Sequence, residues 1–156
     1  MDKIIIDPES RATRAREYFE KGYNCSQAVL LAYSDLCGID ESQAAQVASS
    51  FGGGMGRMRE VCGSLSGAFM ALGLICGYSD PQDREGKNRQ YACVREIARR
   101  FAEQNGSIVC RELLARVEHT DGGDAEVRTA EYYKKRPCGE LCACAARILA
   151  DVVNVN

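Results

Sequence analysis

Nine cysteines occur in this chain, and four of them stand where the sequence predicts that a helix begins. A helix start carries about half a positive charge and several N–H groups without an intrahelical partner, so it stabilises a thiolate. Thiolates bind zinc and iron–sulfur clusters, and they are also the nucleophiles of thiol–disulfide exchange. The candidate site therefore consists of Cys25, Cys62, Cys110 and Cys138.

The other five cysteines divide into four that we expect to be structural and one that is ambiguous. The structural ones either precede a glycine at a predicted helix end or lie inside a helix, where cysteine behaves as a small buried hydrophobe. They are Cys37, Cys76, Cys93 and Cys144. Cys142 lies one helical turn after Cys138 on the same face, so it is a possible additional or substitute ligand.

Three kinds of chemistry fit four thiolates that come from distant parts of the chain. An iron–sulfur cluster is the first, because helix starts aimed at one point would stabilise its negative charge through N–H···S contacts. Zinc is the second, although structural zinc sites usually take paired C-x(2–4)-C ligands, and only Cys138 and Cys142 fit that spacing loosely. A cluster-free thiol oxidoreductase is the third, with Cys62 as a catalytic thiolate of low pKa. The lack of a C-x-x-C pair counts against it.

A glycine-rich turn, residues 51–56, precedes Cys62. It does not match the G-x-x-x-x-G-K-[ST] loop, and no strand precedes it, so nucleotide binding is not indicated. Glycines with φ > 0 would instead let the backbone and its N–H groups approach the cysteine site. Gly54, Gly56, Gly63 and Ser64 are the candidate residues for binding a small anionic ligand or cluster, although plain tight packing is the commoner reason for glycines in such a turn.

Basic residues follow this turn and also precede Cys138. Arg57, Arg59 and the run of residues 134–136 could form a positive rim around the cysteine site. Such charges are more often a solvated face, and that is our expectation. The single histidine, His119, lies in a polar loop and is expected to be solvated, which leaves no Ser/His/Asp constellation.

Composition predicts an ordinary globular protein. The chain has 156 residues, a net charge of −2 and no basic half, so we expect one domain over residues 1–156 that binds neither nucleic acid nor a membrane surface. No apolar run approaches the ~18 residues of a membrane span. The first six residues are too short for a secretory signal, and we expect a cytoplasmic protein.

The elements that must position these residues are helices in almost every segment. Proline after aspartate or arginine marks helix starts at Pro8, Pro81 and Pro137, and glycine marks most helix ends. We predict an all-α, single-domain bundle of about six to eight helices with short loops. The predicted helices cover residues 8–21, 25–37, 41–50, 62–76, 81–105, 110–117, 125–135 and 137–152.

Five blocks of this sequence resemble the C_GCAxxG_C_C family, to which a redox role is ascribed. The blocks are GYNCSQAVL at 22–30, FGGGMGRM at 51–58, VCGSLSGA at 61–68, GSIVCREL at 106–113 and RPC at 136–138. The resemblance covers most of the chain, from about Ala15 to Leu149. It implies a small bacterial redox protein whose four characteristic cysteines are Cys25, Cys62, Cys110 and Cys138.

The family also resembles a domain of split-Soret cytochromes that holds an iron–sulfur cluster. This chain has no C-x-x-C-H, which excludes covalent haem attachment through that motif. It departs from the family at Ser64, where the family block has alanine, and a hydroxyl there could donate to a sulfur or bond to its own helix.

We therefore expect a redox-active protein that binds an iron–sulfur cluster for electron transfer, either as an oxidoreductase or as an electron carrier. The alternatives are the thiol–disulfide oxidoreductase and a zinc-stapled, non-enzymatic domain. Its expected partner is a redox protein or a small-molecule electron acceptor, and a homodimer is plausible for a small helical protein.

Overall fold

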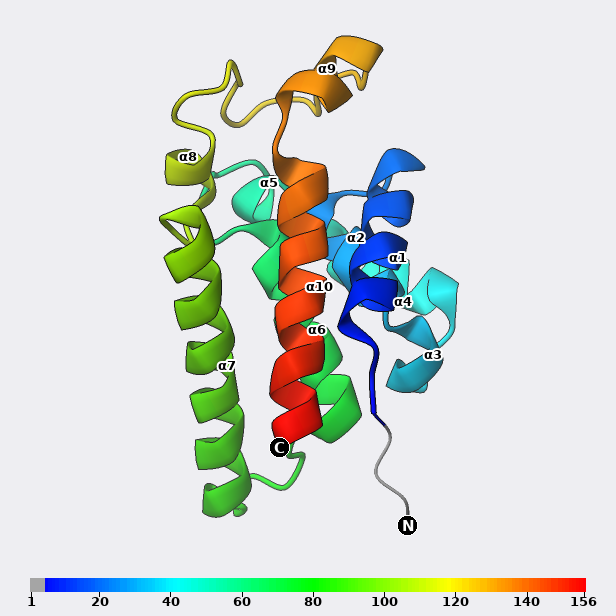
Figure 1. Ribbon diagram of the computed structural model, residues 1–156, viewed down its shortest axis with the longest axis vertical. Coiled ribbons are helices and arrows are strands. Elements are labelled where there is room, and N and C mark those ends of the chain that lie inside the picture. The colour runs from blue at the N-terminus through cyan, green and yellow to red at the C-terminus, as the bar shows by residue number, and fades with distance from the viewer. Residues whose placement is uncertain (1–4) are drawn as a thin grey trace.

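The computed structural model describes residues 5–156, and helices account for most of this range (Figure 1). The longer helices are α1 (Pro8–Glu20), α2 (Cys25–Leu31), α4 (Glu41–Ala48), α6 (Gly63–Cys76), α7 (Arg84–Asn105) and α10 (Cys138–Val155). The shorter ones are α3 (Ser34–Cys37), α5 (Gly52–Met55), α8 (Cys110–Leu113), α9 (Ala130–Lys135) and the 3-10 turn η1 (Ser49–Phe51). Over these described residues there is no β-strand, only an isolated bridge between Val61 and Val109. The all-α prediction is confirmed.

Helix α10 is the centre of the bundle, and Figure 1 shows α1 and α7 alongside it. Helices α2 and α6 also pack against it. Small side chains allow this arrangement, because a helix surface made of alanine lets neighbouring helices approach on several sides. The fully buried alanines of α10 are Ala143, Ala145, Ala146 and Ala150. Within residues 5–156, no helix combines the length and the apolar character needed to traverse a lipid bilayer.

The outer helices bury one stripe each. In α1 the stripe consists of Ala12, Ala15 and Phe19, at spacings of three and four residues, as an amphipathic helix requires. Helix α7 is the longest and buries few large side chains, chiefly Ile97 and Phe101. Its C-terminal half is therefore the part that the core holds in place.

Most helix starts lie where their capping residues predict. Asp7 caps α1, and Asn24 forms a capping box with Gln27 at the start of α2. The predicted start of α7 at Pro81 is wrong by three residues. Asp80 accepts from the N–H of Gln82 in a turn, and Asp83 is the residue that caps the helix.

The helix predicted over residues 25–37 is in fact two helices, α2 and α3. The chain leaves helical geometry at Tyr33, whose ring is fully buried and whose hydroxyl donates to the carbonyl of Ala146 at 2.7 Å. The guanidinium of Arg11 donates to the carbonyl of Ala32 at 2.8 Å. Arg11 thus satisfies a carbonyl at the end of α2 and Tyr33 anchors the chain to α10, and neither contact is visible in the local sequence.

Two further helices are shorter than predicted. Helix α8 ends at Leu113 rather than near residue 117, and α9 begins only after Thr129, whose hydroxyl accepts from the N–H of Tyr132. The preceding residues are irregular, and Arg128 there donates to the carbonyl of Phe19 at 3.0 Å. Helices α8 and α9 and the first turn of α10 lie at the same end of the bundle, at the top of Figure 1.

Candidate metal centre

The four candidate cysteines all stand at helix starts. Cys25, Cys110 and Cys138 are the first residues of α2, α8 and α10, and Cys62 is the residue immediately before α6. The structure brings all four together, because they line a single small cavity of about 50 Å³. The sulfurs of four distant segments therefore share one environment.

Backbone pairing fixes two of these cysteines next to each other. The N–H of Cys62 donates to the carbonyl of Ile108 at 2.8 Å, and the N–H of Cys110 donates to the carbonyl of Glu60 at 2.6 Å. This is the isolated bridge around Val61 and Val109 described above. It joins the segment before α6 to the segment before α8, so both helices start at the cavity.

The other two cysteines meet at the starts of α2 and α10. The thiol of Cys25 interacts with those of Cys138 and Cys142. Cys142 is fully buried and its sulfur lies 3.8 Å from the carbonyl oxygen of Cys25, but it is not among the residues that line the cavity. The role of Cys142 as a substitute ligand stays a prediction.

Two glycines let the backbone approach the cysteines. Gly54 has φ of 67°, and a Cβ there would lie 2.7 Å from the Cβ of Cys110. A Cβ at Gly63 would lie 2.9 Å from the carbonyl oxygen of Phe51 and 3.2 Å from the Cβ of Cys25. Both glycines line the cavity, whereas Gly56 lies outside it and lines a neighbouring pocket.

Ser64 contacts the sulfur of Cys62. Its hydroxyl oxygen lies 2.9 Å from this sulfur, and its backbone N–H also donates to it. The hydroxyl thus adds a polar contact to a sulfur that already receives an N–H from the first turn of α6.

The thiols of this site do not have the low pKa that their helix starts predict. Burial raises the pKa of Cys62 to about 11, although the hydroxyl and N–H of Ser64 lower it. Burial likewise raises the pKa of Cys110 against the opposing effect of Arg59. The pKa of Cys138 is raised well above its usual value by the Cys25 thiol and by burial. Desolvation shifts a pKa by several units, more than a helix dipole does, so burial decides the direction.

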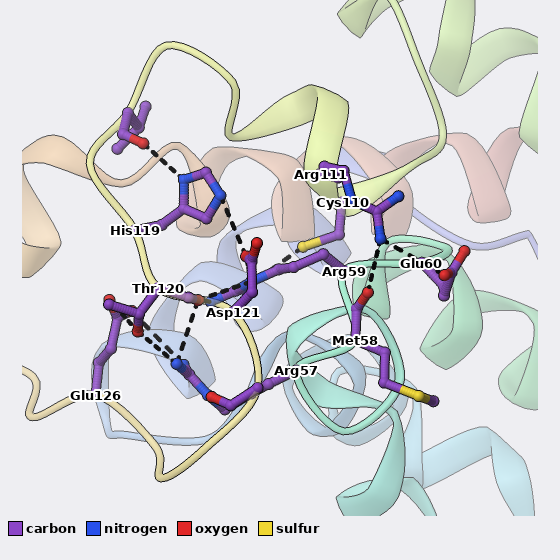
Figure 2. Close-up of polar contacts among 12 residues, drawn as sticks. Arg57, Met58, Arg59, Glu60, Cys110, Arg111, His119, Thr120, Asp121 and Glu126 are labelled. Carbon is purple, nitrogen blue, oxygen red and sulfur yellow. Dashed lines mark hydrogen bonds and ion pairs between the residues drawn. The ribbon is translucent and has the colours of Figure 1, made fainter.

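Three arginines form part of the cavity wall, and two of them correct our expectation of a solvated face. Arg59 is 3% exposed and Arg136 is 9% exposed, and both line the cavity. The guanidinium of Arg59 donates to the sulfur of Cys110 at 3.6 Å (Figure 2). Arg128 is the third, and the sequence analysis missed it. The available signal was the aromatic pair Tyr132 and Tyr133, over which its guanidinium stacks.

The remaining basic residues and the histidine lie apart from the cysteines. The side chains of Lys134 and Lys135 are exposed, as a solvated face predicts. His119 is not solvated, because its side chain is only 17% exposed and Nδ1 lies 2.7 Å from the carbonyl of Val117. Nε2 faces the carboxylate of Asp121 at 3.4 Å (Figure 2).

The four other cysteines are only partly as predicted. Cys37 and Cys144 are buried, and the sulfur of Cys144 contacts the Gln104 side chain on α7 at 3.2 Å. Cys93 is half-buried, and Cys76 is exposed, so the prediction of burial is wrong for Cys76. Cys76 lies in the last turn of α6, where it lines an open pocket together with Arg89, Gln90 and Cys93 of α7.

Among residues 5–156, no three histidine, cysteine, aspartate or glutamate side chains are placed to hold one metal ion. The four sulfurs surround the cavity instead of converging on a single point. The helical fold and this buried set of sulfurs define an all-α, cysteine-rich protein.

Comparison with known proteins agrees with this description. Residues 23–152 match the family model described as "Putative redox-active protein (C_GCAxxG_C_C)". The match spans most of the chain, and the protein belongs to this family. A comparison with curated proteins found no match.

Among solved structures, the split-Soret cytochrome c from Desulfovibrio desulfuricans ATCC 27774, which is described as having a novel iron centre, is similar to this chain. The TM-score is 0.69 at 19% sequence identity, over 99% of this chain and 71% of the cytochrome chain. At this identity the similarity shows a shared fold.

Proposed function

We propose that this member of the redox-active family holds an iron–sulfur cluster through Cys25, Cys62, Cys110 and Cys138 and transfers electrons. One observation carries the proposal: four thiols from four helix starts surround one buried cavity whose wall contains three arginines. The fold is shared with a cytochrome described as having an iron centre. A cluster bound there would take up and release single electrons.

The chemistry of the donor set fits such a group. Thiolates are the usual ligands of iron–sulfur clusters, and four of them bring negative charge into a buried place. Buried charge requires a partner, and Arg59, Arg128 and Arg136 supply positive charge at the cavity wall. The four cysteines enter this cavity from four separate helix starts, which leaves each thiolate able to bind a different atom of a cluster.

The protein's own groups would then set the properties of the site. The N–H and hydroxyl of Ser64 contact the sulfur of Cys62, and Arg59 donates to the sulfur of Cys110. Hydrogen bonds to ligand sulfurs stabilise the more negative state and so raise the reduction potential. Burial of Cys62, Cys110 and Cys138 lowers the local dielectric constant and strengthens each of these interactions.

Two alternatives use the same sulfurs. A zinc-stapled domain needs the four thiolates to converge, which the described side chains do not do. A thiol–disulfide oxidoreductase needs an attacking thiolate at neutral pH, and the pKa of about 11 for Cys62 counts against it. The direct contact between the thiols of Cys25 and Cys138 is the observation that favours this second alternative.

Anaerobic purification distinguishes these functions. We expect a brown protein that contains iron and acid-labile sulfide and bleaches on reduction with dithionite. Zinc without sulfide would indicate the stapled domain. A colourless protein that cannot be reconstituted with iron and sulfide would overturn the proposal and leave thiol chemistry.

A matched pair of variants on α10 tests the ligand set. Cys138→Ser is expected to lose iron and sulfide, because it removes a sulfur from the cavity. Cys144→Ser is the control, because this residue is buried on the same helix but faces Gln104 on α7. Equal loss of iron in both variants would indicate damage to the helix rather than removal of a ligand. The redox partner, the cytoplasmic location and a homodimer stay predictions from the sequence.

A further inference from the structure

A second pocket opens directly beside the cysteine cavity, and its wall is rich in arginine. It has a volume of about 300 Å³, at the lower end of the range for small-molecule sites. Three arginines, Arg59, Arg128 and Arg136, line both spaces. Arg57 and Glu126 line the pocket but not the cysteine cavity. We call this space the arginine pocket.

The loop of residues 119–124 holds two of these arginines in fixed positions (Figure 2). Arg57 donates through Nε to the carbonyl of Gly122 at 2.8 Å, and Arg59 donates through Nη2 to the carbonyl of Thr120 at 2.6 Å. Both arginines also have φ near +60°, at 67° and 59°, which side chains other than glycine rarely adopt. Backbone strain of this kind is commonly retained at binding sites.

Aromatic rings position the other two arginines. The guanidinium of Arg128 stacks over the ring of Phe19, with 4.4 Å to the ring centroid, and that of Arg136 lies 4.9 Å from the centroid of Tyr132. Arg128 donates one hydrogen bond to the carbonyl of Phe19 and pairs with no carboxylate among the residues that the structure describes. A guanidinium has five N–H donors, so most of those on Arg128 are available to a ligand.

The charges of the pocket do not balance. Four guanidinium groups face it, and Glu126 is the only carboxylate among its lining residues. Glu126 pairs with Arg136 and lies 3.9 Å from Arg57, so one carboxylate serves two arginines. Asp121 pairs with Arg59 at 3.3 Å, but it is 60% exposed and lies outside the pocket. Positive charge with too few partners in a half-enclosed space favours the binding of an anion.

We propose that the arginine pocket binds the oxyanion group, carboxylate or phosphate, of a small molecule next to the cysteine site. Guanidinium groups match the geometry of carboxylate and phosphate and bind them with two parallel hydrogen bonds. Glu126 occupies Arg136 in the unliganded pocket and competes with the incoming anion. The proposal does not depend on a metal at the cysteine site.

The main alternative is that these arginines only balance negative charge on the cysteine site. Arg57 separates the two ideas, because it faces the arginine pocket and not the cysteine cavity. Glu126 separates them as well. Its removal improves binding of an external anion, whereas a purely structural ion pair would only lose stability on its removal.

The test is calorimetric titration of the anaerobically purified protein with succinate, inorganic phosphate and pyrophosphate, at an ionic strength held constant with potassium chloride. We expect at least one probe to bind with one-to-one stoichiometry and a Kd below about 1 mM. Comparison of succinate with the phosphates identifies which oxyanion the pocket prefers. Both metal-loaded and metal-free protein are titrated, so a failure here is separate from a failure of the cluster proposal.

Three variants give the decisive comparison. Glu126→Gln is expected to tighten binding about tenfold, and Arg57→Gln to weaken it about tenfold, since each change removes one charge-assisted interaction. Arg99→Gln is the control, because Arg99 lies exposed on α7 in a surface ion pair with Glu96. Its effect should be within twofold. If Arg57→Gln does not fold, the Glu126→Gln result still decides.

Four outcomes would overturn the proposal. They are the absence of saturable binding by all three probes, equal weakening by Arg99→Gln and Arg57→Gln, unchanged or weaker binding in Glu126→Gln, and binding that disappears when metal is loaded. The last outcome would show that the arginines serve the cysteine site alone.

Discussion

Helix α6 has a cysteine at each end, and the two ends provide different surroundings for sulfur. At its start, Cys62 is buried, and its sulfur accepts the N–H of Ser64 and lies against the hydroxyl of the same residue. At its end, Cys76 is exposed, and its thiol donates to the carbonyl of Leu72 at 3.4 Å. One sulfur therefore faces hydrogen-bond donors, and the other faces an acceptor.

This difference follows from the direction of the helix. A helix presents free N–H groups at its start and free carbonyls at its end, so a thiolate is accommodated at the start and a neutral thiol at the end. Burial raises the pKa of both thiols, so acidity in the metal-free protein does not distinguish them. The orientation of the hydrogen bonds distinguishes them, and it is the reason we propose Cys62 as a ligand and not Cys76.

The largest expected effect comes from replacing each of these two cysteines by serine in turn. Cys62→Ser should abolish incorporation of iron and acid-labile sulfide, because it removes a sulfur from the cavity. Cys76→Ser should retain the wild-type content. Elemental analysis of both proteins after anaerobic purification makes the measurement. Retention of iron by Cys62→Ser would remove this residue from the ligand set.

The second expected effect is a loss of stability at alkaline pH in metal-free protein. The pKa of Cys62 is raised from 9.0 to about 11 in the folded state, so folding favours the protonated thiol. The resulting stability, roughly 3 kcal/mol, is present below pH 9 and disappears as pH rises through about 11. Denaturant unfolding across this range should show the decrease. Burial also raises the pKa of Cys37 to about 11, so this thiol contributes to the same decrease in stability. The variant Cys37→Ser measures its contribution.

A third effect concerns the glycine that lets the backbone meet Cys110. Gly54→Ala should destabilise the fold by about 2 kcal/mol or more, because its Cβ would meet the Cβ of Cys110 at 2.7 Å and its φ is positive. Gly106→Ala is the matched control, since φ there is 90° but nothing lies within 4 Å of the added Cβ. It should lose only about 1 kcal/mol, from backbone strain alone. Equal losses in denaturant titration would contradict the close approach at Gly54.

The smallest expected effect is on the reduction potential. Ser64→Ala removes the hydroxyl beside the sulfur of Cys62 and keeps the N–H contact. Loss of one hydrogen bond to a ligand sulfur should lower the potential by on the order of tens of mV. Redox titration of the loaded protein measures it, with Ser66→Ala two residues further along α6 as the control. An unchanged potential would show that the hydroxyl does not act on the sulfur.

The sequence predicted the features that depend on neighbouring residues. Asp7 with Pro8, Asn24 and Pro137 each act locally, and each predicted its helix start well. The placement of Cys25 and Cys138 at helix starts followed from Asn24 and Pro137, whereas the helix starts at Cys62 and Cys110 have no capping side chain. The first pair could therefore be named from local signals before the fold was known.

Features that depend on distant contacts were missed. The helix break at Tyr33 depends on partners in α1 and α10, and the burial of Arg59 depends on a loop about sixty residues further along the chain. The same reason explains why the raised pKa of Cys62 was not predicted. Its helix start is visible in the sequence, but the burial that outweighs it exists only in the folded protein.

The two backbone hydrogen bonds between the segments before α6 and α8 have a consequence for assembly. They join the two ends of a stretch of chain that contains all of α6 and α7, so the helical hairpin is closed at the end where the cysteines lie. Cys62 and Cys110 lie on the two paired segments. A group that bonds to both sulfurs would stabilise this pairing, and the amide proton of Cys110 would then exchange more slowly with solvent.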